Sequence, residues 1–268
     1  MKVNPSFLLG FFLIVALWSC EGAEDTPLSP PSPSPPEEIV DTPPMLSLPT
    51  ESGVQAVSME PGFRTESMSL SGNTSMIYSI SVPEEVEEGA VPLVLALHGG
   101  NGDAGSAEGF MECLPIPALK GLDAIIFAPT GGEWWQELHT MRVVELVRLA
   151  KMFWPIDTNK VVVTGYSNGG TGSVYFAKNF PETFSAAIPM GGNYMEPTCP
   201  LIPTYLIHGE EDEFYSPVLL QQTVSGLQAS DCDIQLEFVP GATHGAACTM
   251  ITQLAGASFW LQNEVWKE

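Results

Sequence analysis

Short runs of apolar and β-branched residues alternate along the chain with longer segments whose apolar residues recur at helical spacing. This alternation is typical of an α/β fold with a mostly parallel sheet covered by helices on both faces. Strands are predicted over Ser75–Val82, Leu93–Leu97, Ala124–Ala128, Lys160–Thr164, Ala186–Pro189, Thr204–Ile207 and Ile234–Val239. Helices are predicted over Glu137–Phe153, Gly170–Asn179, Val218–Leu227 and Met250–Trp266. Most of the strands are apolar throughout, so we expect them inside the sheet.

The N-terminal residues have the pattern of an export signal. An apolar run from Phe7 to Trp18 is short for a membrane-spanning helix, and it is followed by Ser19-Cys20. Leu17-Trp18-Ser19-Cys20 resembles a bacterial lipobox, so residues 1–19 are expected to be removed and Cys20 to carry a lipid. The protein is then anchored to a bacterial membrane, facing the periplasm or the exterior. An ordinary cleaved signal and secretion are the alternative.

Residues 20–44 are rich in proline, serine and acidic side chains, a composition that cannot bury enough apolar surface to fold. We expect an extended tether there and one folded domain over residues 45–268. The formal net charge of the chain is −23 at pH 7. Such an excess of acid argues against nucleic acid as a partner, and membrane contact is expected only through Cys20.

Four cysteines follow the tether, namely Cys113, Cys199, Cys232 and Cys248. An even number in an exported protein favours disulfides, and four cysteines allow three pairings. We favour Cys232 with Cys248, because that bridge closes the loop that carries His244; a free buried thiol at Cys113 is an alternative. No cysteine or histidine cluster has metal-ligand spacing, so neither a metal nor another cofactor is expected.

The stretch Gly165-Tyr166-Ser167-Asn168-Gly169-Gly170 carries the strongest chemical signal. The apolar run Val161–Val163 precedes it and a helical segment follows, which is the context of a serine on a sharp strand-to-helix turn. The glycines let neighbouring chains pass close to Ser167. The main-chain N–H of Asn168, at the start of the helix, is expected to stabilise an oxyanion.

A base for Ser167 is expected after the last strand, with the chain order serine, acid, histidine. Of the four histidines only His244 meets that requirement. We expect His98 and His208 to bind backbone groups and shape their turns, and His139 to lie at the surface.

The acid is expected beyond a strand end between Ser167 and His244, in the stretch His208-Gly209-Glu210-Glu211-Asp212-Glu213. Asp212 is preferred because it follows the penultimate strand. The alternatives are Glu210, Glu211 and Glu213.

The glycine-rich stretch after Leu97 is expected to supply the second oxyanion donor, from Gly100 or else Asn101. Aromatic side chains near the serine are candidates for substrate contact: Trp134, Trp135 and Tyr166. Packing of one tryptophan in the core is an equally open interpretation.

Residues 75–266 resemble the α/β-hydrolase superfamily. More narrowly, they resemble exported carboxylesterases grouped with polyhydroxybutyrate depolymerases and feruloyl esterases. The matching segments are Leu97-His98-Gly99-Gly100, Gly165 to Gly170, Phe180 to Pro189, His208-Gly209-x-x-Asp212 and Gly-x-x-His244. The resemblance implies an α/β-hydrolase fold, and the short stretch from Met190 to Pro203 leaves little room for a cap domain. It also implies ester hydrolysis through a covalent acyl-enzyme, and the open site expected without a cap domain would admit bulky or polymer-linked esters.

Two other functions remain open at this stage. A serine peptidase of the same fold uses the same three residue types, although such enzymes usually carry a large extra domain. A catalytically silent surface-binding module is the second possibility, and the competent residues at all three positions argue against it. The acyl group, the alcohol, any natural polymer and the oligomeric state are not specified by the sequence.

Overall fold

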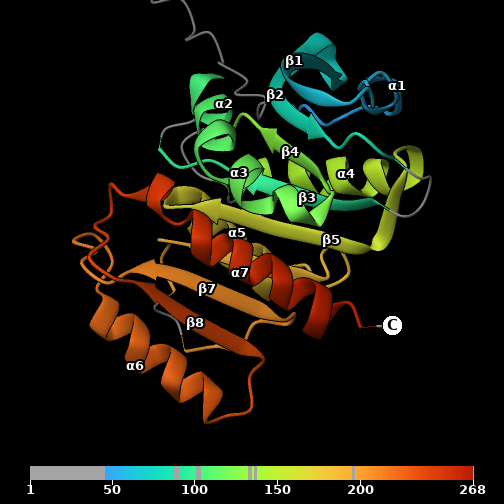
Figure 1. Cartoon of the computed structure of the whole chain (residues 1–268). Helices are drawn as coiled ribbons and strands as arrows, with labels where there is room; N and C mark the ends of the chain where they lie inside the picture. Colours follow the sequence, from blue (N-terminus) through green and yellow to red (C-terminus); the bar gives the residue numbers. More distant parts are fainter. Residues whose placement is uncertain are drawn as a thin grey trace, which may run out of the picture. The chain divides into compact units, whose positions relative to one another are not determined.

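The computed structural model describes residues 46–86, 91–100, 104–131, 135, 138–194 and 197–267. Within these residues eight strands form one sheet in the order β1-β2-β4-β3-β5-β6-β7-β8 (Figure 1). The pairs β1–β2 and β2–β4 are antiparallel and every other neighbouring pair is parallel. The expected Cys20 anchor, the signal and the tether lie outside the described residues.

The strands are β1 Gly62–Leu70, β2 Thr74–Val82, β3 Val91–Leu97, β4 Ile125–Pro129, β5 Ile156–Tyr166, β6 Ala186–Met190, β7 Thr204–Gly209 and β8 Ile234–Val239. The α-helices are α1 Glu51–Gln55, α2 Ala104–Cys113, α3 Pro115–Leu119, α4 Leu138–Phe153, α5 Asn168–Asn179, α6 Pro217–Gln228 and α7 Ile251–Trp260. Shorter helical turns are η1 Ser71–Asn73, η2 Lys120–Leu122, η3 Ala247–Thr249 and η4 Leu261–Val265.

All seven predicted strands and all four predicted helices are present, with ends shifted by a few residues. Strand β1 and helices α1, α2 and α3 were not predicted. The last predicted helix is divided: α7 ends at Trp260 and continues as the wider turn η4. The predicted mostly parallel sheet with helices on both faces is confirmed.

The alternation of side chains along β3 shows how the sheet separates two apolar layers. Leu93, Leu95 and Leu97 point into the cluster that contains the buried residues of α4. Val94 and Ala96 point into the opposite cluster, with buried residues of α2, α3 and α7. In Figure 1, α3 and α7 lie in front of the sheet and α4 and α5 behind it. Both faces of the central strands are therefore covered, as their continuous apolar sequences require.

The local sequence determines where helix α6 begins, shortly after the end of β7. The Ser216 side chain accepts the N–H of Leu219, and Pro217 occupies the first helical position, where its missing N–H costs nothing. Leu220, Val224 and Leu227 form its buried face. The helix start is thereby fixed a few residues after Asp212.

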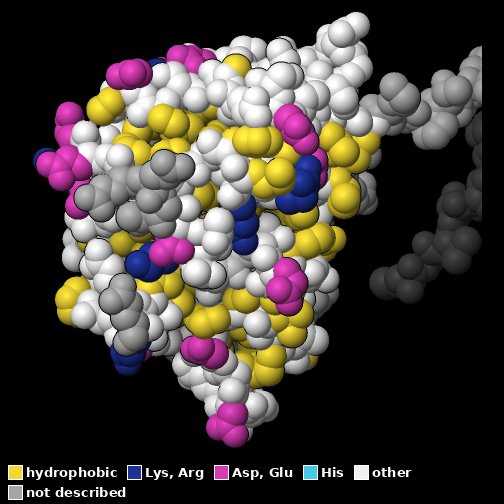
Figure 2. All heavy atoms as spheres, turned by 90° about the vertical axis from the view of Figure 1, so that its right-hand side faces the viewer, with side chains coloured by type: hydrophobic (Ala, Val, Ile, Leu, Met, Phe, Trp, Pro, Cys, Tyr) yellow, Lys and Arg dark blue, Asp and Glu magenta, His cyan; other side chains and the backbone are white. Residues whose placement is uncertain are grey.

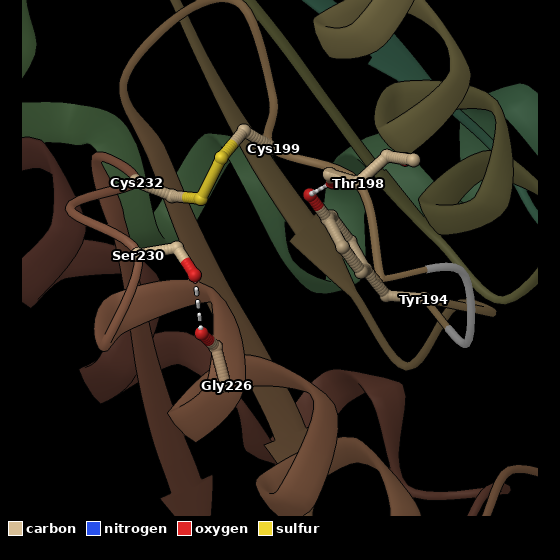
Figure 3. The surroundings of a disulfide bond; sticks show 6 residues. All are labelled: Tyr194, Thr198, Cys199, Gly226, Ser230 and Cys232. Carbon is tan, nitrogen blue, oxygen red and sulfur yellow. Dashed lines mark hydrogen bonds between the residues drawn. A yellow bond between two sulfur atoms is a disulfide. The ribbon is translucent and has the colours of Figure 1, made fainter.

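Two disulfides link distant segments, and they differ from the expected Cys232–Cys248 pairing. Cys113 at the end of α2 is bonded to Cys248 in η3, and Cys199 is bonded to Cys232. Figure 3 shows how the second bond joins the loop before β7 to the segment after α6. The prediction was wrong because the fold brings η3 against α2, with a Cα–Cα distance of 5.2 Å, which no sequence spacing reveals.

The surface carries scattered charge. On the face drawn in Figure 2, acidic side chains are spread among hydrophobic ones, and the basic side chains stand apart from one another. None of the helices within the described ranges combines the length and hydropathy of a membrane span.

Candidate active site

The turn between β5 and α5 holds Ser167 in a strained backbone conformation, with φ 55° and ψ −113°. Close packing around the turn depends on glycine. A Cβ added at Gly169 meets the carbonyl oxygen of Leu97 at 1.8 Å, and one at Gly165 meets the main chain of Gly169 at 2.5 Å. Helix α5 and strand β3 can approach this closely only without those side chains. Ser167 is thus presented, partly exposed, beyond the carboxyl end of β5.

A continuous chain of hydrogen bonds joins Ser167, His244 and Asp212. Ser167 Oγ lies 2.9 Å from His244 Nε2, and His244 Nδ1 lies 2.8 Å from Asp212 Oδ2. Because an ionised carboxylate only accepts, Nδ1 carries the proton and Nε2 is left as an acceptor for the serine hydroxyl. The three residues predicted to meet are therefore brought together, in the geometry that activates a serine.

The Asp212 carboxylate is buried, with its side chain 1% exposed, yet it is well supplied with donors. The N–H groups of Phe214 and Tyr215 bind Oδ1 at 2.9 and 2.8 Å. Burial alone would raise the pKa of Asp212, but the hydrogen bonds from Tyr215, His244 and Phe214 outweigh it and hold the pKa below its usual value. The carboxylate is therefore ionised at neutral pH.

His208 lies beneath this carboxylate and completes its support. Its Nε2–H donates to the Tyr215 carbonyl at 2.9 Å and lies 3.5 Å from Asp212 Oδ2. Burial lowers the pKa of His208, against the opposing effects of the Tyr215 carbonyl and Asp212. The expectation that His208 shapes its own turn is confirmed.

The loop that carries His244 is fixed through its main chain. The N–H of His244 donates to Glu213 Oε2 at 2.9 Å, and the Tyr166 hydroxyl donates to its carbonyl. A Cβ at Gly209 would lie 2.4 Å from the Ala242 carbonyl oxygen, so the loops after β7 and β8 are in direct contact. Glu213, considered above as an alternative acid, binds the backbone of the histidine and not its ring.

The contact made by Tyr166 corrects the expectation that it binds substrate. Its side chain is buried, and its hydroxyl is already used on the His244 carbonyl. Burial, followed by the negative charges of Asp212 and Glu213, raises its pKa. It therefore supports His244 from below as a neutral phenol.

The two expected oxyanion donors lie on neighbouring segments. Asn168 is the first residue of α5, where N–H groups point out of the helix end. Its side-chain amide donates to the Gly100 carbonyl at 3.3 Å, which links α5 to the loop after β3. Gly100 has φ +72°, and a Cβ at Gly99 would lie 3.3 Å from that of Ser167. The loop thus passes directly beside the serine; the alternative donor, Asn101, lies outside the described residues.

Buried His98 and Trp135 hold the same loop from within. His98 Nδ1–H donates to the Gly99 carbonyl at 2.8 Å, and Nε2 accepts the N–H of Gly131 at 3.1 Å. Trp135 Nε1–H donates to the His98 carbonyl at 2.9 Å. His98 therefore binds backbone groups, as expected.

The substrate role expected for Trp135 is corrected, because the side chain is 1% exposed and packs in the core. Trp134 lies outside the described residues. His139, expected at the surface, is partly exposed and packs against Trp135, and burial lowers its pKa. Among the described residues no group of three His, Cys, Asp or Glu side chains is placed to bind a metal ion.

Comparison with known sequences matches the Dienelactone hydrolase family model to residues 128–258, a range that contains Ser167, Asp212 and His244. Over 105 residues the chain is 30% identical to the "Putative carboxymethylenebutenolidase" of Aquifex aeolicus, covering 38% of this chain and 44% of that protein. The chain thus spans less than half the length of this curated relative.

Solved structures give the fold. A thermostable esterase is similar with a TM-score of 0.60 and 20% identity, over 74% of this chain and 62% of that one. Esterase 2 of Thermogutta terrifontis is similar with a TM-score of 0.59 and 14% identity, over 79% of this chain and 97% of that one. Together with the sheet order, these similarities show that the chain has the α/β-hydrolase fold.

Proposed function

We propose that this α/β-hydrolase-fold protein is a serine hydrolase that cleaves carboxylic esters through a Ser-His-Asp triad and an acyl-enzyme intermediate. The hydrogen-bonded series Ser167–His244–Asp212, with Ser167 on the strained turn after β5, carries this proposal. A serine hydroxyl without a base is a poor nucleophile, whereas this one has its acceptor in place.

In the acylation step, Ser167 Oγ attacks the ester carbonyl carbon while its proton passes to His244 Nε2. Asp212 holds the Nδ1–H and stabilises the imidazolium that forms. The tetrahedral intermediate collapses, the bond to the alcohol oxygen breaks, and His244 returns the proton to that oxygen. The acyl group stays on Ser167 as an ester.

Deacylation repeats the sequence with water. His244 takes a proton from the water, the resulting oxygen nucleophile attacks the acyl-enzyme, and the carboxylic acid leaves as Ser167 regains its proton. In both steps the N–H groups of Asn168 and Gly100 are proposed to stabilise the oxyanion. Loss of one such donor typically costs about 10²- to 10³-fold in rate.

Esters are favoured as the substrate class by the comparisons. The matched family model describes dienelactone hydrolases, and the two similar structures are named as esterases. The narrower likeness to polyhydroxybutyrate depolymerases and feruloyl esterases, with bulky or polymer-linked substrates, stays a prediction. A peptidase of the same fold is the competing activity.

A fluorophosphonate probe tests the nucleophile. We expect the folded wild-type protein to be labelled at Ser167 and Ser167→Ala to remain unlabelled. Ser167→Ala and His244→Ala should each lower ester turnover by roughly 10⁴-fold or more without unfolding the domain. A folded wild type that takes up no probe would favour a silent binding module instead.

A substrate panel tests the reaction. Acetyl, feruloyl, hydroxybutyrate and longer acyl esters are compared with aminoacyl amides. Faster hydrolysis of the amides than of short esters would make the protein a peptidase.

We also propose that the protein is exported and anchored through Cys20. The N-terminal sequence pattern supports this, and the two disulfides fit an oxidising compartment. Cys20→Ser should move the protein from the membrane to the soluble fraction; equal membrane recovery of both forms would exclude the anchor.

A further inference from the structure

A large apolar side chain, Phe214, lies exposed beside His244 and Asp212. Phe214 is 72% exposed, and its ring centroid lies 4.6 Å from that of His244 with the planes inclined by 37°. Its N–H donates to Asp212 Oδ1 at 2.9 Å. The turn that presents the carboxylate therefore also holds the main chain of Phe214, whose ring contacts His244 and is otherwise largely exposed to solvent.

Exposure alone does not distinguish Phe214, because single apolar side chains are common on protein surfaces. Its contact with His244 does. Phe259 on α7 is comparably exposed, at 66%, but has no ring contact with His244 among the aromatic pairs of the described residues. The apolar character also continues along the chain, since Val218 and Leu219 in the first turn of α6 are exposed.

The reaction proposed above decides which part of an ester meets Phe214. His244 must return its proton to the leaving alcohol, so the alcohol oxygen has to come within hydrogen-bond reach of Nε2. The acyl carbonyl oxygen is directed instead toward the N–H groups of Asn168 and Gly100. The alcohol portion must therefore approach this imidazole, and Phe214 is the exposed apolar ring in contact with it.

We propose that Phe214 binds the alcohol portion of the substrate, so that the enzyme favours esters of apolar alcohols, aromatic ones above all. This inference rests on the proposed ester hydrolysis. An aromatic alcohol can pack against the exposed part of the Phe214 ring, which removes apolar surface of both rings from water.

The two-step mechanism gives this contact a kinetic signature. The alcohol is present during acylation and has left before deacylation. Loss of Phe214 should therefore lower kcat/KM for apolar alcohols, while kcat stays unchanged for substrates whose deacylation is rate-limiting.

The experiment compares two ester series in wild type, Phe214→Ala and Phe214→Leu. In the alcohol series, methyl and benzyl acetate share the acyl group and have leaving alcohols of similar acidity. In the acyl series, ethyl acetate and ethyl hexanoate share the alcohol. The Ala variant keeps the main-chain N–H that binds Asp212, and Phe259→Ala is the matched control.

For Phe214→Ala we expect kcat/KM to fall about tenfold more on benzyl acetate than on methyl acetate, with the ratio within the acyl series unchanged. Phe214→Leu should retain part of the preference, and Phe259→Ala should behave as wild type. These results would support the contact.

Three outcomes would overturn the inference and leave ester hydrolysis standing. Equal losses on methyl and benzyl acetate would mean that the ring only positions His244. A changed ratio of kcat/KM between ethyl acetate and ethyl hexanoate would mean that the ring contacts the acyl group. Unchanged kinetics on all four esters would mean that the ring does not contact the substrate. A wild type without turnover on any ester would instead overturn the proposed function and this inference with it.

Discussion

The carboxylate of Glu213 accepts the main-chain N–H of His244 at 2.9 Å, while the adjacent Asp212 accepts the ring Nδ1–H of the same histidine at 2.8 Å. One turn after β7 therefore holds both the backbone and the imidazole of His244. Consecutive residues at this turn perform separate tasks.

Glu213→Ala is expected to lower kcat by about three- to tenfold, because the histidine loop loses one anchor while the hydrogen bond to Asp212 remains. Glu213→Gln should be close to wild type, since its amide oxygen can accept the same N–H. Steady-state kinetics on one ester measures both variants. Glu210→Ala, an exposed carboxylate on the same loop, is the control; if it matches Glu213→Ala, the effect is one of charge and not of anchoring.

The two disulfides should differ in their effects on stability and activity. On chain-entropy grounds, Cys113–Cys248 closes 135 residues and contributes about 5 kcal/mol, and Cys199–Cys232 closes 33 residues and contributes about 4 kcal/mol. Since η3 follows closely on His244, opening Cys113–Cys248 by paired Cys→Ser changes should also lower turnover of the folded protein. Opening Cys199–Cys232 should lower only the melting temperature. Equal turnover in both double variants would show that the Cys113–Cys248 bond does not affect the active site.

Acid should destabilise the fold through two histidines, since burial lowers the pKa of both His208 and His139. Burial lowers the folded-state pKa of His208 from 6.5, so below that pH the unfolded chain binds a proton that the folded one does not. The unfolding free energy, measured with urea, should therefore fall as pH drops below 6.5. The lowered pKa of Asp212 adds a second loss at more acidic pH, as its carboxylate is protonated.

His208→Gln is the matching variant for this pH profile, because its amide can still donate to the Tyr215 carbonyl. We expect the unfolding free energy of this variant to depend less on pH just below pH 6.5. In stronger acid it should fall as in the wild type. A profile parallel to that of the wild type would exclude His208 as the cause.

Glycine-to-alanine changes at two helical positions should have opposite effects. At Gly169 a Cβ collides with the Leu97 carbonyl, so Gly169→Ala is expected to displace the turn around Ser167 and to lower both activity and melting temperature. At Gly256 on α7 a Cβ meets nothing within 4 Å. Gly256→Ala should therefore stabilise the protein by about 1 kcal/mol with unchanged turnover. Thermal unfolding and ester kinetics check both; a tolerated Gly169→Ala would contradict the close approach.

Sequence patterns predicted most of the fold because the central strands are apolar on both faces. Strand β1 lacked this signal: seven of its positions are exposed or only partly buried, as suits a strand at the edge of the described sheet, next to β2. Helix α2 was missed because Gly105, Ser106 and Gly109 weaken the helical pattern. Local sequence could not show that packing against the sheet would compensate for them.

The meeting of Ser167, His244 and Asp212 was predictable because each follows the carboxyl end of a parallel strand, and those ends lie at one edge of the sheet. The supporting contacts were not. Loop geometry decides which tryptophan is buried and which carboxylate binds the His244 N–H. It also decides which group accepts the Tyr166 hydroxyl. Such geometry is set by packing between segments far apart in the sequence.

The bonding pattern of the cysteines has a consequence for biosynthesis. Cys199–Cys232 is nested inside the segment that Cys113–Cys248 closes. As the polypeptide emerges from its N-terminal end, Cys113 meets Cys199 and Cys232 before its native partner has been made. Oxidation in order of emergence would trap wrong bonds, so a cell with thiol–disulfide shuffling catalysts should yield more correctly folded protein than one that only oxidises.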